Sequence, residues 1–235
     1  INDSIPNALT LIKSLNPREP ILHNFVPKNF TTYLSLMVDN VRQLEDNFKD
    51  YSRKANIPLS KIDFSPLNSI SEIGWLNVGM QQSIIFHLNS LEDIPNFDTG
   101  QEEPKTYRGI NYYKIELPKD IKSMLSSFGQ KISPTWSCQY EDYLILSETE
   151  SGIKNLLSNY LDQNTLDKNL NFKAIQDRLA NANSFIWVGQ SKNLTDYWGK
   201  NGNQTKFLKA LPVSDYPLVV FQGVGEESFT HLHLS

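Results

Sequence analysis

Two stretches of similar pattern decide the predicted fold: YLSLMVDNVRQLEDNFKDY at residues 33–51 and YLILSETESGIKNLLSNYL at residues 143–161. Each begins with a short apolar strand pattern and continues with apolar residues at about the 3.6-residue period of a one-sided helix. A polar residue, Asp39 in the first and Thr149 in the second, stands where a side-chain oxygen can accept from the free amides of a first helical turn. Each stretch therefore predicts a strand followed by a capped helix.

Neighbouring elements recur in the same order at an offset of about 110 residues, which is the signature of a duplication. WLNVG at residues 75–79 matches FIWVG at residues 185–189, and later strand patterns match in the same way, as do helical patterns upstream. The segment before each stretch, ILHNFVPKNFTTYL in one case and TWSCQYEDYL in the other, is expected to contain another strand with a short turn. The alternative is one α+β domain whose hairpins are similar by coincidence.

We therefore predict an α+β fold of two tandem, weakly similar repeats, residues 1–118 and 119–235, which can also pack as one continuous domain. Strands that follow one another through short turns favour a mostly antiparallel sheet in each repeat, with helices packed on one face. The chain opens on Ile1 and closes on an unfinished strand pattern, FTHLHLS. We expect it to be a fragment of a longer protein.

Composition excludes several classes of protein. With 235 residues and 39% hydrophobic residues, the chain can bury a core without a disulfide or a metal. The net charge is −4 and the basic residues are scattered, which argues against nucleic acid as a partner. Cys138 is the only cysteine, so no intrachain disulfide forms. The longest apolar runs are far shorter than the ~20 residues of a transmembrane helix.

Four carboxylates around the second stretch are candidates for a reaction centre. Glu141 and Asp142 fall in a predicted turn between strands, where Asp bonds locally to the backbone. Glu148 and Glu150 flank a predicted helix start, where the helix dipole favours negative charge. Paired carboxylates of a glycoside hydrolase remain an alternative, because the sequence does not give their separation in space. We favour the structural interpretation.

The other reactive side chains give no recognisable site. His231 and His233 share one face of a predicted strand, a spacing that suits a metal, but their counterparts Lys114 and Glu116 are typical of a solvated strand face. GVGEES at residues 223–228 lies between strand patterns, whereas a phosphate loop needs a helix behind it. Cys138 has no basic neighbour and is expected to be structural. We predict no catalytic, cofactor-binding or metal-binding residues, and hence no cofactor.

The most suggestive surface feature is DYWGKNGNQT at residues 196–205, which carries Tyr197 and Trp198. Aromatic faces beside Asn and Lys can stack on a sugar or bind a protein. The alternative is that the rings fold back over the end of the sheet. Tyr197 and Trp198 are therefore speculative binding residues.

The second half also resembles a known family. The strand YLILS leads to a helix, then to TLDKNLNFKAIQDRLANANSFIWVG at residues 165–189, and later to FTHLHL. This pattern is similar to an uncharacterised family of bacterial envelope proteins, a domain of unknown function found in anchored, exported proteins. The similarity is best over about residues 107–189 and fainter over about residues 29–88. It implies export and an anchor in the full-length protein, but no activity and no functional residues.

We therefore expect a non-catalytic structural or interaction module of an exported bacterial envelope protein, periplasmic or membrane-anchored, with an unknown protein or glycan partner. The alternative is a carbohydrate- or ligand-binding domain that uses Tyr197 and Trp198. A hydrolase that depends on carboxylates is the least favoured hypothesis.

Overall fold

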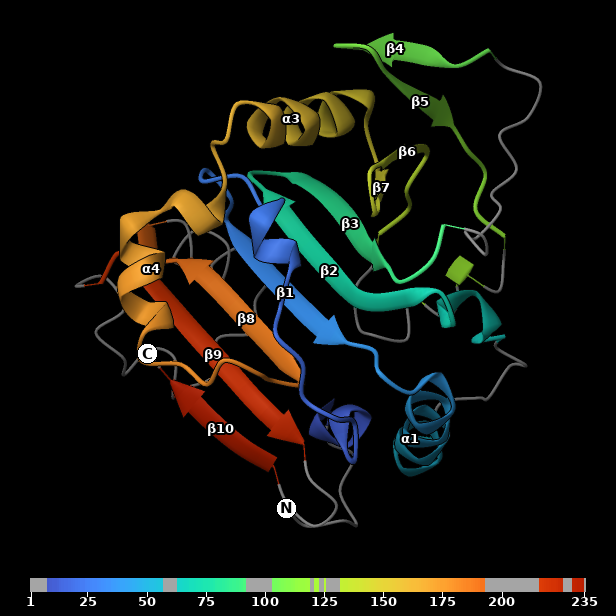
Figure 1. Ribbon diagram of the computed structural model, residues 1–235. Helices are drawn as coiled ribbons and strands as arrows, with labels where there is room; N and C mark the ends of the chain where they lie inside the picture. Colours follow the sequence, from blue (N-terminus) through green and yellow to red (C-terminus); the bar gives the residue numbers. More distant parts are fainter. Residues whose placement is uncertain are drawn as a thin grey trace.

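A computed structural model describes residues 8–56, 63–91, 103–118, 121–122, 125, 132–192, 216–225 and 230–234. Ten strands form one antiparallel sheet in the order β10-β9-β8-β1-β2-β3-β7-β6-β5-β4 (Figure 1). The strands are β1 (Thr32–Met37), β2 (Ile70–Val78), β3 (Gln81–Leu88), β4 (Lys105–Tyr107), β5 (Ile110–Lys114), β6 (Trp136–Tyr140), β7 (Tyr143–Ser147), β8 (Phe185–Gln190), β9 (Leu218–Gly225) and β10 (Thr230–Leu234). The prediction of an α+β fold with an antiparallel sheet is confirmed.

Among the residues that the structure describes, the α-helices with given bounds are α1 (Val41–Lys54), α3 (Glu150–Leu161) and α4 (Leu170–Gln176). Short 3-10 helices are η1 (Ala8–Ile12), η2 (Leu22–Asn24), η3 (Ser65–Leu67) and η4 (Leu166–Lys168). Thr149 caps α3 as predicted, because its side chain accepts from the amide of Gly152. The predicted cap of α1 is wrong by one residue: Asn40, not Asp39, accepts from the amide of Gln43.

Each face of the central strands packs against its own hydrophobic core, because successive side chains of a strand point to opposite faces. One core, which we call the α1-side core, includes Leu36, Leu44, Phe48, Ile73 and Phe86. The other, the α3-side core, includes Tyr33, Ile85, Ile145, Ile153 and Leu156. The strands β1, β2, β3 and β7 are therefore covered on both sides, and most of their side chains, polar ones included, are buried.

The predicted repeat is not confirmed by the order of the strands. In the first predicted copy β1 pairs with β2, but the corresponding strands of the second copy, β7 and β8, are separated by β1, β2 and β3. Strand β8 instead pairs with β1, and β7 pairs with β3. Blocks of strands from the two predicted copies thus follow one another within a single sheet: β10-β9-β8 from the second copy, β1-β2-β3 from the first, β7-β6 from the second and β5-β4 from the first. We expected a separate sheet in each copy.

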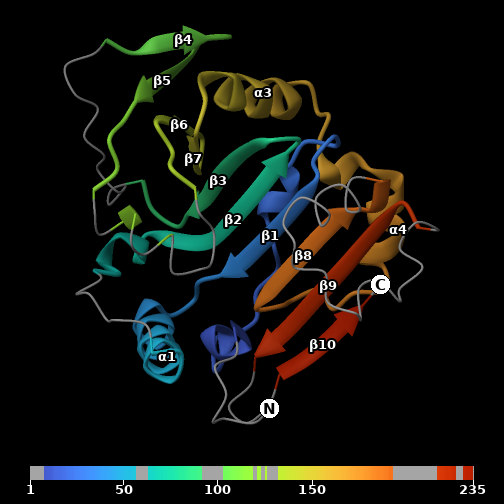
Figure 2. The same ribbon diagram turned by 180° about the vertical axis from the view of Figure 1, so that it is seen from behind.

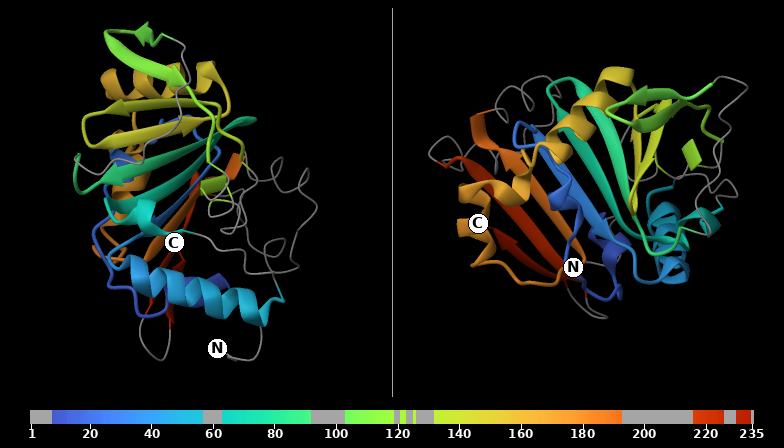
Figure 3. Two further views of the ribbon diagram at one scale, coloured as in Figure 1. Left: turned by 90° about the vertical axis from the view of Figure 1, so that its right-hand side faces the viewer. Right: turned by 45° about the horizontal axis from the view of Figure 1, so that its top comes forward.

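The helices are also arranged differently from the prediction. Helix α1 contributes to one core, and α3 and α4 contribute to the other, so the one sheet has helices on both faces. Figure 1 and the left view of Figure 3 show α3 at the top of the molecule and α1 at the bottom.

The prediction of a strand in ILHNFVPKNF is wrong, since residues 22–24 form the 3-10 helix η2. Figure 2 shows the β4–β5 hairpin projecting from the end of the sheet.

Candidate functional site

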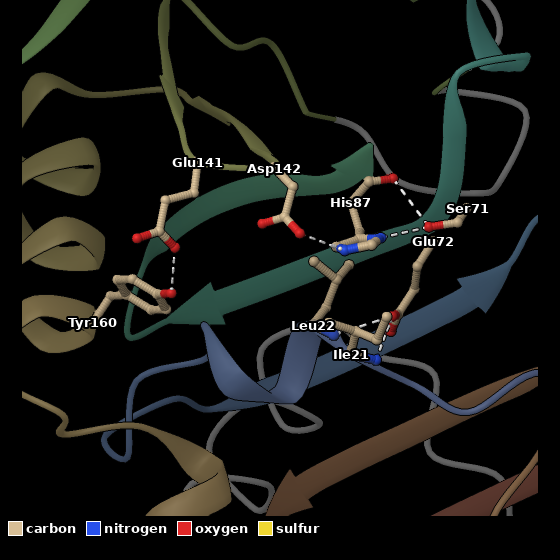
Figure 4. A network of polar contacts seen from close by, with 8 residues as sticks. All are labelled: Ile21, Leu22, Ser71, Glu72, His87, Glu141, Asp142 and Tyr160. Atoms are coloured by element: carbon tan, nitrogen blue, oxygen red, sulfur yellow. Dashed lines mark hydrogen bonds and ion pairs between the residues drawn. The ribbon is translucent and has the colours of Figure 1, made fainter. Parts of the chain in front are cut away.

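A network of polar side chains lies where the sheet is irregular, at the start of β2 (Figure 4). The register between β2 and β3 shifts between Ile70 and Glu72, so Ser71 is the extra residue of a β-bulge. Bulges redirect side chains and are common beside functional sites. Here the bulge brings Ser71 and Glu72, neighbours in sequence, into two adjacent polar clusters.

The first cluster is the line Ser71–His87–Asp142, which we call the Ser–His–Asp relay. Ser71 Oγ lies 2.5 Å from His87 Nδ1, and His87 Nε2 lies 3.0 Å from Asp142 Oδ2. A carboxylate only accepts hydrogen bonds, so Nε2 carries the proton that points at Asp142. In the neutral ring Nδ1 is then an acceptor, and Ser71 donates to it. The three groups come from β2, β3 and the turn before β7.

Burial is uneven along the relay. Ser71 is 7% exposed, the side chain of His87 is 12% exposed, and that of Asp142 is 47% exposed. The ring of His87 packs edge-on against Tyr143, with the ring centroids 5.7 Å apart. The hydroxyl of Ser71 also lies 3.3 Å from the carbonyl oxygen of His87. The histidine is therefore held by contacts on three sides, and solvent reaches the relay mainly at Asp142.

The second cluster surrounds Glu72, which is only 1% exposed. Its carboxylate accepts from the backbone amides of Ile21 at 2.6 Å and Leu22 at 3.0 Å, from Tyr33 Oη at 3.1 Å, and from the hydroxyl of Ser35. Burial raises the pKa of this carboxyl above its usual value, and the four hydrogen bonds oppose that rise. The cluster fixes the start of η2 to β1 and β2, so its role is structural.

The four carboxylates singled out in the sequence do not converge. Asp142 belongs to the relay, and Glu141 accepts from Tyr160 Oη at 2.8 Å (Figure 4). Glu148 accepts from the amide of Ser133 at 3.2 Å. Since each group has a different partner, the described geometry brings no two of them together as an acid and a base.

Glu150, at the first turn of α3, is the most strongly paired of these carboxylates. It lies 2.6 Å from Lys105 Nζ and 2.7 Å from Lys154 Nζ, and it accepts from Tyr112 Oη at 2.8 Å. The Lys105 ammonium, followed by Lys154 and Tyr112, lowers the pKa of Glu150 to about 2. Glu150 thus ties the β4–β5 hairpin to α3.

Other predicted positions fall in different places. Tyr197 and Trp198 lie outside the described residues. His231 and His233 are in β10, opposite Val224 and Gln222 of β9. Cys138 is fully buried, and burial raises the pKa of its thiol to about 12, so it is unreactive as a nucleophile at neutral pH.

An aromatic pair on β8 and β9 was not singled out in the sequence. Trp187 and Phe221 pair directly across the two strands, with ring centroids 5.5 Å apart, and both are half-buried. Their neighbours Ile186 and Val188 belong to the α3-side core, so Trp187 faces the opposite side. The sequence FIWVG could have revealed this residue, because side chains alternate along a strand and Trp187 must therefore lie on the face opposite Ile186 and Val188.

The relay was missed because its members belong to different elements. No motif in the sequence links His87 to Ser71 or to Asp142. The pairing of Glu72 with His87 across the β2–β3 hairpin follows from the turn at Gly79, which has a φ of 60°. Asp142 joins only because β3 pairs with β7, a contact between distant parts of the chain.

No group of three or more His, Cys, Asp and Glu side chains among the described residues is arranged to hold a metal ion. In the same part of the chain, no helix is long and apolar enough to cross a bilayer. Comparisons of this chain with models of protein families, with curated proteins and with solved structures gave no match.

Proposed function

We propose that this chain is a structural and interaction module of an exported bacterial envelope protein that binds a protein partner there. The observation that carries the interaction role is the pair Trp187 and Phe221. The two rings contact each other, are half-buried, and belong to neither core. Aromatic side chains are enriched at protein interfaces, because they bury a large area at a small cost in conformational entropy.

The sheet around this pair supports the proposal. Phe185 lies on the same face as Gly223, and a Cβ atom at Gly223 would come within 2.1 Å of Phe185 Cε1. Glycine therefore makes room for the ring of Phe185 beside β9, and Phe185 packs against the α1-side core, whereas Trp187 and Phe221 belong to neither core. The export and the anchor rest on the sequence resemblance alone.

The interaction role is tested by crosslinking in cells. A photoreactive residue replaces Trp187 in the full-length protein, and another replaces Met80, an isolated and 82% exposed side chain at the β2–β3 turn. We expect one discrete crosslinked product from position 187 in the envelope fraction, and its loss when Phe221→Ala is added. Equal crosslinking from position 80, or a product indifferent to Phe221→Ala, would contradict the role of this pair.

A glycan is the second candidate partner. The observation that favours it is that β8 and β9, which carry Trp187 and Phe221, are joined by the segment that contains Tyr197 and Trp198. Aromatic rings stack on the apolar faces of sugars. Co-sedimentation with insoluble peptidoglycan tests this candidate. Binding that Trp187→Ala removes and Met80→Ala keeps would support it, and the absence of wild-type protein from the pellet would exclude peptidoglycan as the ligand.

A further inference from the structure

The Ser–His–Asp relay satisfies the geometric conditions for an activated nucleophile. Such a site needs a hydroxyl within hydrogen-bond distance of a base, and a third group that orients the base. Ser71 Oγ is 2.5 Å from Nδ1 of His87, and Asp142 is 3.0 Å from the other ring nitrogen. Asp142 fixes the proton on Nε2, which leaves the lone pair of Nδ1 directed at the serine hydroxyl.

We propose that Ser71 is a nucleophile that takes an acyl group from a small ester, with His87 as its general base. This goes beyond the proposed interaction role and does not depend on it. The proposal contradicts our sequence-based expectation of no catalytic residues, because the three groups meet only through the bulge in β2 and the pairing of β3 with β7.

The chemistry balances without a cofactor. Ser71 Oγ forms a bond to the ester carbonyl carbon and its proton passes to His87 Nδ1. The bond from carbon to the alcohol oxygen breaks, and the leaving alcohol takes the proton from His87. Water then adds to the acyl carbon and gives a proton to Nδ1. The carboxylic acid leaves, and Ser71 Oγ recovers its proton from the ring.

The burial of the relay defines the class of substrate. Ser71 is 7% exposed, whereas Asp142 at the other end is 47% exposed. An electrophile must therefore reach the most enclosed member of the three. A compact acyl group such as acetyl fits this requirement, and a long fatty acyl chain does not.

The test uses two probes on the wild-type protein. Methanesulfonyl fluoride, a compact reagent, is the first, and we expect a single adduct on Ser71, located by peptide mass spectrometry. The second is a pair of p-nitrophenyl esters, and we expect acetate to react at least tenfold faster than octanoate. Circular dichroism confirms that the sample is folded during labelling.

Variants separate a nucleophile from a serine that only supports the fold. Ser71→Ala should abolish the adduct, and His87→Gln should slow labelling by roughly 100-fold or more, the usual contribution of a general base. Asp142→Asn should slow it as well, because it no longer fixes the tautomer. The matched control is Ser83→Ala, because Ser83 is equally buried and its hydroxyl donates to Ser147 at 3.0 Å. Labelling should be unchanged in that variant.

Three outcomes would overturn the proposal. The first is a folded wild-type protein that acquires no adduct, a result that needs no variant to interpret. The second is an adduct on another residue that survives Ser71→Ala. The third is a labelling rate at Ser71 that His87→Gln leaves unchanged, which would show that the imidazole is not the base.

Discussion

Glu72 and Glu150 are both carboxylates with several donors, yet their surroundings differ completely. Glu72 lies inside the sheet with two backbone amides and two hydroxyls as partners and no cation among them. Glu150 lies at the surface of α3 with two lysines. Burial raises the pKa of the first, and the lysines lower that of the second. The comparison teaches that a buried carboxylate organises the backbone around it, while a surface carboxylate links side chains of neighbouring elements.

The largest expected effect comes from Glu72→Ala. The variant leaves the amides of Ile21 and Leu22 and two hydroxyls without their acceptor in a buried site. We expect a loss of about 3–5 kcal/mol in the free energy of unfolding, since each unsatisfied buried donor costs ~1–3 kcal/mol. Urea denaturation measures the change. Glu72→Gln keeps the volume of the side chain and one acceptor oxygen, and it should lose less stability. Equal losses from the two variants would contradict the expectation that one remaining acceptor oxygen supports the site.

A smaller effect is expected from Gly152→Ala at the start of α3. A Cβ atom there would lie 2.1 Å from Ser147 Oγ, so the helix or β7 must shift. Overpacking of this kind typically costs about 1–3 kcal/mol. Thermal unfolding measures the loss. If Ser147→Gly restores stability to Gly152→Ala, the contact is the cause. If Ser147→Gly does not restore stability, the loss in Gly152→Ala has a cause other than the contact with Ser147.

The smallest effect on stability at neutral pH is expected from Glu150→Gln. The carboxylate is near the surface, where water and salt screen its ion pairs with Lys105 and Lys154. We expect a smaller fall in melting temperature than for Gly152→Ala, and a smaller difference still in 1 M salt. An effect as large as that of Glu72→Ala would show that the β4–β5 hairpin depends on this carboxylate.

The pH dependence of the two sites should have opposite signs. The folded pKa of Glu150 is depressed, so its contribution is present above the unfolded value near ~4.5 and is lost as the pH falls toward about 2. The folded pKa of Glu72 is raised, so its contribution is complete below the unfolded value and is lost as the pH rises through the folded one. Urea unfolding of Glu150→Gln, Glu72→Gln and wild type from pH 2 to 7 measures the two contributions to the free energy of unfolding. If the two differences from wild type change with pH in the same direction, the assigned pKa directions are wrong.

Local pattern predicted much of the secondary structure. The period of apolar residues located α1 and α3, and short apolar patterns located β1 and β7. Thr149 was recognised as a cap because that interaction lies within one turn. The order of the strands was not predictable in this way. A strand pattern specifies which side chains face a core, but not which strand lies beside it, and β8 pairs with β1 across more than half of the chain.

The candidate site was hidden for the same reason. The turn at Gly79 connects Ser71 with His87, but Asp142 comes from another hairpin. The sequence did reveal the turn at Glu141 and Asp142, where Glu141 adopts a φ of 53°. It did not reveal that this turn faces His87. The sequence placed Asp142 correctly in a turn, but its partner His87 lies far away in the chain and was not predictable from the local pattern.

The central position of β1 has a consequence for folding during synthesis on the ribosome. One edge of β1 can pair with β2 soon after synthesis, but the other edge waits for β8, which is translated much later. Until then an apolar strand has unpaired amides and carbonyls that can capture another chain. Folding of the sheet is thus completed only when the last third of the described chain has emerged. A nascent chain of this protein should be a strong client for chaperones that protect exposed strand edges.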